Sequence, residues 1–224
     1  NDTFIKVFEE ERELTMMLII DISGSNFFGS NSAFKNEYVT ELAATLAFSA
    51  TKNNDKVGLI LFSDNVELYI PPKKGKSHVL RIIRELLEFK SKSKKTDINV
   101  PLKFVSNILK NRSIAFIISD FISQDYSNSL KIFSSRHDVT GIRVYDQTEE
   151  IIPNLGVIDI NDNETGKRIT VNTTSKNLRK KYNEYYNSKR NEFIDFFKRS
   201  GSGIIECNTQ DDYQKKLLKY FKSR

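Results

Sequence analysis

The sequence predicts an α/β fold with a mainly parallel central sheet and helices on both faces, and two observations support this prediction. Apolar runs such as Met16 to Ile20 and Ile114 to Ser119 are too short to cross a bilayer and lack helical periodicity, so they indicate strands buried on both faces. Segments of helical periodicity alternate with these runs, and this order implies right-handed crossovers in a doubly wound sheet. A small β-hairpin and C-terminal helices are expected to follow.

The first elements are predicted from periodicity and composition. Thr3 to Phe8 alternates loosely and predicts an edge strand ahead of the central strand at Met16 to Ile20. Phe34 to Asn53 predicts a helix, because its larger apolar residues share one stripe and its alanines let it lie close to the sheet. Val57 to Phe62 predicts the next buried strand.

A short strand and a helix should come next. Val66 to Ile70 is expected to pair with the preceding strand until Pro71 and Pro72 end the pairing, since proline gives the ladder no donor. Ser77 is expected to cap the following helix. The inward positions of that helix are expected to be Leu80, Ile83, Leu86 and Leu87.

The middle of the chain repeats the alternation. Ile98 to Lys110 predicts a helix, in which Pro101 fits only within the first turn. The apolar strand at Ile114 to Ser119 follows. A helix over Tyr126 to Ser135 and a strand over Val139 to Val144 complete this part.

The pattern changes after Pro153. Val157 to Ile160 and Arg168 to Val171 predict a β-hairpin, and Ile204 to Cys207 and Tyr213 to Phe221 predict a last strand and a terminal helix. A long amphipathic helix is expected between them, from Leu178 to Phe197. Its inner side is expected to carry Leu178, Tyr182, Tyr185, Phe193, Phe196 and Phe197.

Length and composition indicate one globular domain. The 224 residues suffice for one sizeable core, which we place at about 12–150, with a hairpin and helix extension at 151–224. Contents of 38% hydrophobic and 29% charged residues exclude a disordered or collagenous chain. The single cysteine, Cys207, excludes an intrachain disulfide framework and fits a reducing compartment, so we expect a cytoplasmic protein. No apolar run approaches the roughly 20 residues of a membrane-spanning helix.

A candidate metal site follows the first central strand. Asp21 ends this strand, and Ser23 and Ser25 present hydroxyls at alternate positions around a glycine. A carboxylate and two hydroxyls suit a hard cation such as Mg²⁺, which takes oxygen ligands. Thr96 offers another hydroxyl at a loop-to-helix junction, and Asp120 ends the strand at Ile114 to Ser119. The motif alone also fits a polar strand-to-helix turn.

Several separated phrases make the chain similar to a known family. D-I-S-G-S, Thr96 and the strand-ending Asp120 resemble the metal-ion-dependent adhesion site of von Willebrand factor A (vWA) domains. F-E-E-E-R-E-L-T, N-D-K-V-G-L-I-L-F-S-D, Y-I-P-P-K-K-G, F-I-I-S-D-F and R-H-D-V-T resemble the bacterial domain of unknown function 58 family. Members of that family carry additional sequence ahead of F-E-E-E-R, and this chain lacks an initiator Met, so we expect it to be N-terminally truncated.

The resemblance implies a Rossmann-like vWA fold and a binding function. It implies that Mg²⁺, or Mn²⁺ or Ca²⁺, is held by Asp21, Ser23, Ser25, Thr96 and Asp120. The hydroxyls would bind the ion directly and the aspartates commonly act through water, which leaves a position for an Asp or Glu of a partner protein. The resemblance also implies a MoxR-type AAA+ ATPase as that partner, with the chain as an adaptor or chaperone-like protein.

Side chains near the site are candidates for a partner-binding rim. Phe27 and Phe28 follow the serines in a polar loop, where they either pack beneath the loop or meet a partner. From Lys73 to Lys95 there are nine basic residues against two acidic ones, within a net charge of +6. This segment borders Thr96 and forms either a positive rim for an acidic partner or a solvated surface. The rim lysines are Lys90, Lys92, Lys94 and Lys95.

Two alternatives to a protein-binding module remain. The basic segment could bind nucleic acid or another polyanion, although no aromatics are interleaved with its charges and no nucleic-acid-binding motif accompanies it. A metal-dependent phosphohydrolase is less favoured. Such an enzyme needs an acid/base carboxylate two residues after a nucleophilic aspartate, and Ser23 stands there. We therefore expect no catalysis and no catalytic residues.

Overall fold

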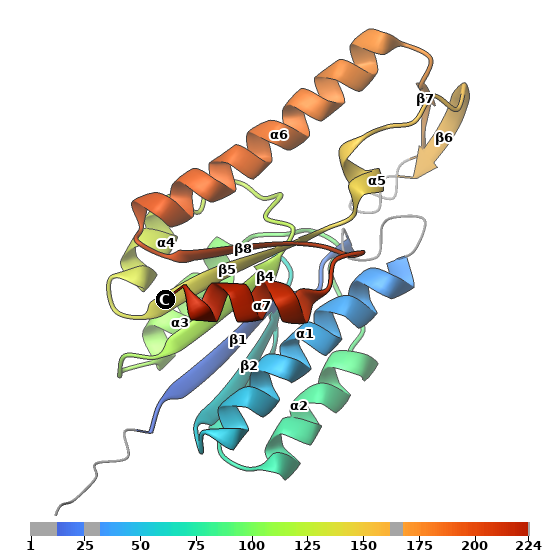
Figure 1. Ribbon diagram of the computed structural model, residues 1–224. Helices are drawn as coiled ribbons and strands as arrows, with labels where there is room; N and C mark the ends of the chain where they lie inside the picture. Colours follow the sequence, from blue (N-terminus) through green and yellow to red (C-terminus); the bar gives the residue numbers. More distant parts are fainter. Residues whose placement is uncertain (1–12, 25–31, 162–167, 224) are drawn as a thin grey trace, which may run out of the picture.

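The computed structural model describes residues 13–24, 32–161 and 168–223. Within these ranges the central sheet has six strands in the order β3-β2-β1-β4-β5-β8, and only β3 is antiparallel to its neighbour (Figure 1). The expected edge strand at Thr3 to Phe8 lies outside the described residues. The strands of the sheet are β1 (Thr15–Asp21), β2 (Lys56–Phe62), β3 (Val66–Lys73), β4 (Ile114–Ser119), β5 (Asp138–Tyr145) and β8 (Gly203–Asn208).

Helices cover both faces of this sheet, as predicted. Alternate residues of β1 separate the two cores, since Leu18 and Ile20 join one apolar cluster whereas Met17 and Ile19 join the other. The first cluster includes residues of α1 (Ser32–Lys52), α2 (Lys76–Glu88) and α7 (Tyr213–Lys222). The second includes residues of α3 (Asn99–Ile108), α4 (Ser127–Ser134) and α6 (Lys176–Arg199).

Strand β3 continues through the two prolines that we expected to end it. Ile70 pairs with Leu59, but the next pair joins Lys73 to Val57, so β3 has one extra residue at this point. The β-bulge places Pro71 and Pro72 where the ladder is already irregular, on a strand that lies at the edge of the described sheet. The missing N–H groups therefore do not interrupt the strand.

Helix α2 begins earlier and faces the core differently than expected. Gly75, with a φ of 101°, precedes the helix, so Ser77 lies inside the first turn and does not cap it. Leu80 and Leu87 are 56% and 62% exposed, which contradicts their predicted inward position. The face toward the sheet is shifted by about one position, because three residues share the buried stripe: Val79, Ile82 and Leu86.

Helix α6 packs closely on β5, with one change from the predicted inner side. Phe193 and Phe197 are fully buried as expected, but Tyr185 is 52% exposed and its neighbour Tyr186 is buried. The close approach needs Gly141 of β5, where an added Cβ would lie 2.5 Å from Phe197 Cε1. A glycine in the strand thus lets two aromatic rings of α6 rest on the sheet.

The remaining elements agree with the predicted order. The antiparallel pair β6 (Val157–Asn161) and β7 (Arg168–Asn172) forms the hairpin, and the short helix α5 (Gln147–Glu150) precedes it. Strand β8 pairs with β5, so the part of the chain beyond residue 151 contributes to the central sheet. Cys207 of β8 is fully buried. Among the helices of the described ranges, none combines the length and the apolarity that crossing a bilayer requires.

Candidate functional site

The candidate site lies where the doubly wound sheet changes direction. Strands β1 and β4 are parallel neighbours, and the helices that follow them, α1 and α4, cover opposite faces. Sheets of this type bind ligands at the carboxyl ends of the strands beside such a switch point. The pairing of Ile20 with Ile118 brings Asp21 beside Ser119 at this edge.

Asp21 is a buried carboxylate held from two sides. Its Oδ1 accepts the backbone N–H of Ser23 at 2.9 Å, and its Oδ2 accepts the hydroxyl of Ser119 at 2.7 Å. Burial, and then the nearby charge of Asp120, raise the pKa of Asp21 to about 6, although the hydrogen bonds from Ser119 and Ser23 oppose this shift. Two acidic groups are therefore concentrated in a site with little access to water.

Asp120 occupies the equivalent position after β4. It is 3% exposed, and its Oδ1 accepts the backbone N–H of Ile122 at 3.0 Å. Phe121 between them has a φ of 60°, which turns the chain sharply out of the strand, and its ring stacks on Phe193 at 4.3 Å between centroids. The strained turn, held by aromatic packing, fixes the carboxylate at the strand end.

The loop before α3 contacts the loops that follow the neighbouring strands. The N–H of Gly24 donates to the carbonyl of Lys94 at 3.0 Å, and the hydroxyl of Ser123 donates to the carbonyl of Thr96 at 3.5 Å. The N–H of Asp97 donates to the carbonyl of Ser63, directly after β2, at 3.1 Å. The Thr96 hydroxyl is buried and has no hydrogen-bond partner among the described residues.

The structure brings together the described part of the predicted set. Asp21, Ser23 and Asp120 are buried at the strand ends, and the loop that carries Thr96 is held against them. Ser25, Phe27 and Phe28 lie outside the described residues. The four rim lysines are exposed and come from the segment between α2 and Thr96: Lys90, Lys92, Lys94 and Lys95.

The donor set fits a hard cation. Two carboxylates and several hydroxyls supply only oxygen, the ligand type that Mg²⁺, Mn²⁺ and Ca²⁺ prefer. The described ranges contain no group of three or more His, Cys, Asp or Glu side chains placed to hold a metal ion, so the candidate set depends on hydroxyl oxygens as well as on its two carboxylates. The Thr96 hydroxyl is the direct test of fit, because a buried oxygen without a partner is costly unless something binds it.

A buried ion pair next to the site was not predicted from the sequence. The ammonium of Lys35, on α1, contacts both carboxylate oxygens of Glu149, on α5, at 3.0 and 3.1 Å. Tyr186 of α6 donates its hydroxyl to Glu149 Oε2 at 3.1 Å. Burial raises the pKa of Glu149, Lys35 lowers it, and the charge of Asp120 raises it further. This cluster therefore lies within electrostatic reach of the candidate site.

One protein family matches most of the chain. The family described as "Protein of unknown function DUF58" matches residues 1–192. The chain belongs to the DUF58 family. Among curated proteins, this DUF58 chain is 22% identical over 219 residues to an uncharacterized protein of Mycobacterium tuberculosis, covering 96% of this chain and 68% of that protein. An uncharacterized protein of Mycobacterium avium is 26% identical over 118 residues, covering 51% of this chain and 68% of that protein.

Solved structures of similar fold cover nearly all of this DUF58 protein. The conserved hypothetical protein BatB from Bacteroides thetaiotaomicron has a TM-score of 0.63 at 16% identity, covering 94% of this chain and 98% of that one. An aerotolerance-related membrane protein from Bacteroides fragilis has a TM-score of 0.61 at 18% identity, covering 94% and 100%. A von Willebrand factor type A protein from Catenulispora acidiphila, at 10% identity, has a TM-score of 0.46 and covers 60% and 34%. The mainly parallel sheet with helices on both faces, together with the first two of these structures, confirms the predicted α/β fold class.

Proposed function

We propose that this DUF58 protein is a non-enzymatic, metal-dependent protein-binding module. The observation that carries the proposal is the buried hydroxyl of Thr96, which has no hydrogen-bond partner among the described residues. It lies in a loop held against the strand ends that bear Asp21 and Asp120. Mg²⁺ is the ion that we favour, with Mn²⁺ or Ca²⁺ as substitutes. When bound, the ion would supply a Lewis-acidic position that attracts a carboxylate of the partner.

The residues of the chain divide this task. Ser23, Ser25 and Thr96 would hold the ion through hydroxyl oxygens, whereas Asp21 and Asp120 would orient water or accept hydrogen bonds beside it. Ser119 and the Ser23 N–H already fix both oxygens of Asp21. Such supporting contacts control metal affinity by about 10- to 100-fold in other sites. Burial of Asp21, Ser23 and Asp120 limits the water that competes with the partner's carboxylate.

Thr96→Val is expected to weaken Mn²⁺ binding by at least about tenfold and to leave the metal-free protein equally or more stable. The unchanged or higher stability is expected because the change removes a buried hydroxyl that makes no hydrogen bond within the described part of the chain. Titration calorimetry and thermal unfolding in EDTA measure the two effects. Thr45→Val, at a half-buried threonine of α1 whose hydroxyl donates to the Glu41 carbonyl, is the control for loss of a threonine hydroxyl away from the site. Wild-type Mn²⁺ binding by Thr96→Val and by a Ser23→Ala/Ser25→Ala variant would end the assignment.

The proposed partner is a MoxR-type AAA+ ATPase, which the family resemblance suggests. The site requires that the partner present an Asp or Glu side chain able to reach the metal. Pull-down from lysate with Mg²⁺ and with EDTA tests this. Recovery of such an ATPase only with Mg²⁺ supports the adaptor role. Metal-independent recovery of nucleic acid would instead favour polyanion binding by the basic segment.

Replacement of the rim lysines by Gln is expected to slow association with an acidic partner and to reduce its salt dependence. Charge steering acts on the association rate and is screened over about 10 Å at 0.1 M salt. Stopped-flow measurement on the quadruple variant of Lys90, Lys92, Lys94 and Lys95 tests this. The control replaces four other exposed lysines by Gln. An equal decrease in the association rate of this control would show that only the net charge of the protein matters. The control positions are Lys110, Lys131, Lys198 and Lys219.

A further inference from the structure

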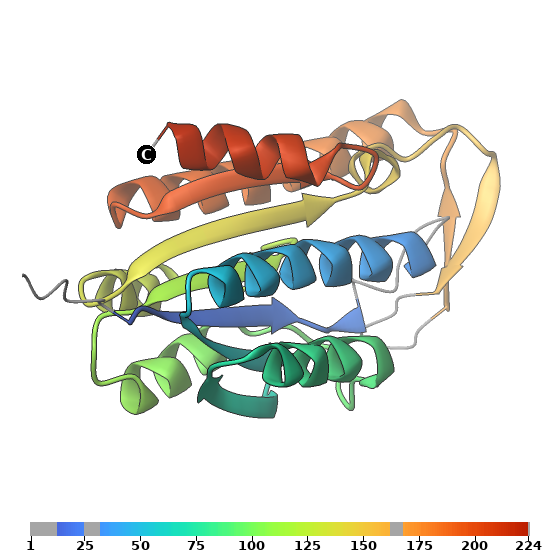
Figure 2. The ribbon, with the colours of Figure 1, turned by 60° about the horizontal axis from the view of Figure 1, so that its bottom comes forward.

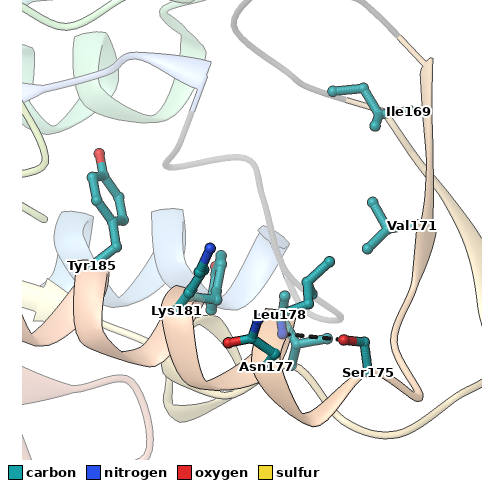
Figure 3. Close-up of a pocket in the computed structure, with 9 residues that line it drawn as sticks. Ile169, Val171, Ser175, Asn177, Leu178, Lys181 and Tyr185 are labelled. Atoms are coloured by element: carbon teal, nitrogen blue, oxygen red, sulfur yellow. Dashed lines mark hydrogen bonds between the residues drawn. The ribbon is translucent and has the colours of Figure 1, made fainter.

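An apolar groove lies between the β6–β7 hairpin and the first turns of α6. It has a volume of about 620 Å³, within the range of roughly 300–1,000 Å³ typical of ligand pockets. Figure 3 shows Ile169 and Val171 of β7 across the groove from the side chains of α6. The apolar lining consists of Ile152, Ile169, Val171, Leu178, Tyr182 and Tyr185.

Apolar side chains around this groove are unusually exposed for a folded surface. Ile169 and Tyr185, which line it, are 51% and 52% exposed. Ile151 and Leu155, in the segment before β6, are 57% and 63% exposed. Val157 is 66% exposed on the other face of the hairpin, since it pairs with Asn172 whereas the groove-lining Val171 pairs with Ile158. Exposed apolar groups that gather in one region, rather than singly, mark interaction surfaces.

The first turns of α6, which line one side of the groove, carry charges of one sign. Lys176, Arg179, Lys180 and Lys181 occupy the first turns of α6, whose first turn holds no acidic residue. The positive end of the helix dipole is there, so these cations are unfavourably placed. Over the described ranges, Lys180 has only an exposed pair with Glu184 at 3.7 Å, and the other three make no ion pair. An anionic occupant would relieve this repulsion.

We propose that the groove binds an amphipathic, acidic segment of a partner protein. Leu178, Lys181 and Tyr185 follow the i, i+3, i+7 spacing of one helix face, so a single stripe offers apolar contacts and an ammonium. Apolar side chains of the segment enter the groove, and its Asp or Glu side chains meet Lys181 and the neighbouring cations. A second copy of this chain would bring the same cations together, and a flat membrane does not fill a concave groove.

The groove lies at the same end of the molecule as the candidate metal site. Figure 2 shows β1 pointing toward the end where the hairpin stands. One partner can therefore contact both places, and this last step rests on the proposed function. The groove itself needs no metal, since its lining contains none of the proposed metal ligands.

The test uses a fluorescent peptide of Leu and Glu, with the leucines at i, i+3, i+4 and i+7, added to the full chain in EDTA. Anisotropy should show binding that weakens with salt. Ile169→Ser, Tyr185→Ser and Lys181→Glu should each raise the Kd by about tenfold, the effect of losing an interface anchor. Leu218→Ser and Lys219→Glu, at exposed positions of α7, are the matched controls and should bind as wild type.

Four results would overturn the proposal. These are absence of binding, equal binding of a Leu and Lys peptide, binding only to phosphatidylserine vesicles, and self-association that Ile169→Ser abolishes. The Ser23→Ala/Ser25→Ala variant separates this proposal from the metal site, because it should bind the peptide normally. Loss of peptide binding in that variant contradicts a metal-independent groove, whereas failure of the Mn²⁺ titration leaves the peptide result unchanged.

Discussion

Lys35→Met is expected to lower the free energy of unfolding by about 3–5 kcal/mol, the cost of leaving a buried charge without its partner. The side chains of Lys35 and Glu149 are only 2% and 7% exposed, so water cannot replace the lost ammonium. Tyr186 and the Asp146 N–H still donate to Glu149, but two neutral donors do not balance a buried carboxylate. The nearby charge of Asp120 adds to the penalty. Urea unfolding monitored by circular dichroism measures the difference.

The controls separate burial from the mere presence of an ion pair. Lys180→Met removes the exposed pair with Glu184 and should change stability by no more than about 1 kcal/mol. The triple variant Lys35→Met/Glu149→Leu/Tyr186→Phe should recover most of the loss, because both buried charges and the hydroxyl are removed together. Wild-type stability of Lys35→Met would show that this pair is not buried in solution.

Asp120→Asn is expected to abolish metal-dependent partner capture while the protein stays folded. The amide oxygen can still accept the Ile122 N–H, so the turn after β4 keeps its hydrogen bond. The substitution also removes the charge that repels the Asp21 carboxylate and raises its pKa. The melting temperature of the variant in EDTA should therefore equal or exceed that of the wild type. Mn²⁺ affinity should fall by about 10- to 100-fold, because the carboxylate orients the ion's surroundings.

Both quantities are measured on one purified sample. Differential scanning calorimetry in EDTA reports folding, and Mn²⁺ titration followed by pull-down reports binding. Asp195→Asn, on the outer side of α6, is the control for a lost negative charge. A misfolded Asp120→Asn protein would show that the Asp120 carboxylate is needed for folding. A folded variant that captures its partner normally in EDTA would refute the metal-gated mechanism.

The strand ends were predictable because their signals are local. Short apolar runs that stop at Asp21 and Asp120 identify two buried strands, and parallel pairing then brings their ends to one edge. The contribution of Ser119 follows from the same register, once Ile20 is paired with Ile118. The candidate site could therefore be predicted mainly from the order of the strands and helices along the chain.

Other features depend on tertiary contacts that periodicity does not contain. Lys35 and Glu149 are 114 positions apart, and each resembles an ordinary surface residue in its own segment. Tyr185 and Tyr186 are adjacent aromatics, and Tyr186 is the one that turns inward, where its hydroxyl donates to Glu149 and its ring lies against the Arg143 guanidinium. Ser77 is a good capping residue, but the positive φ of Gly75 starts the helix earlier. In each case a tertiary contact or a backbone conformation outweighs the local preference of the sequence.

The proline pair of β3 has a consequence for how copies of the protein behave at high concentration. An edge strand exposes unpaired N–H and C=O groups, and another chain can add to them as a new strand. Pro71 and Pro72 have no N–H to offer, the bulge twists this part of the edge, and Lys73 adds a charge at its end. These three features protect one margin of the sheet from aggregation. Val substitution at both prolines is thus a route to self-association that leaves the candidate site untouched.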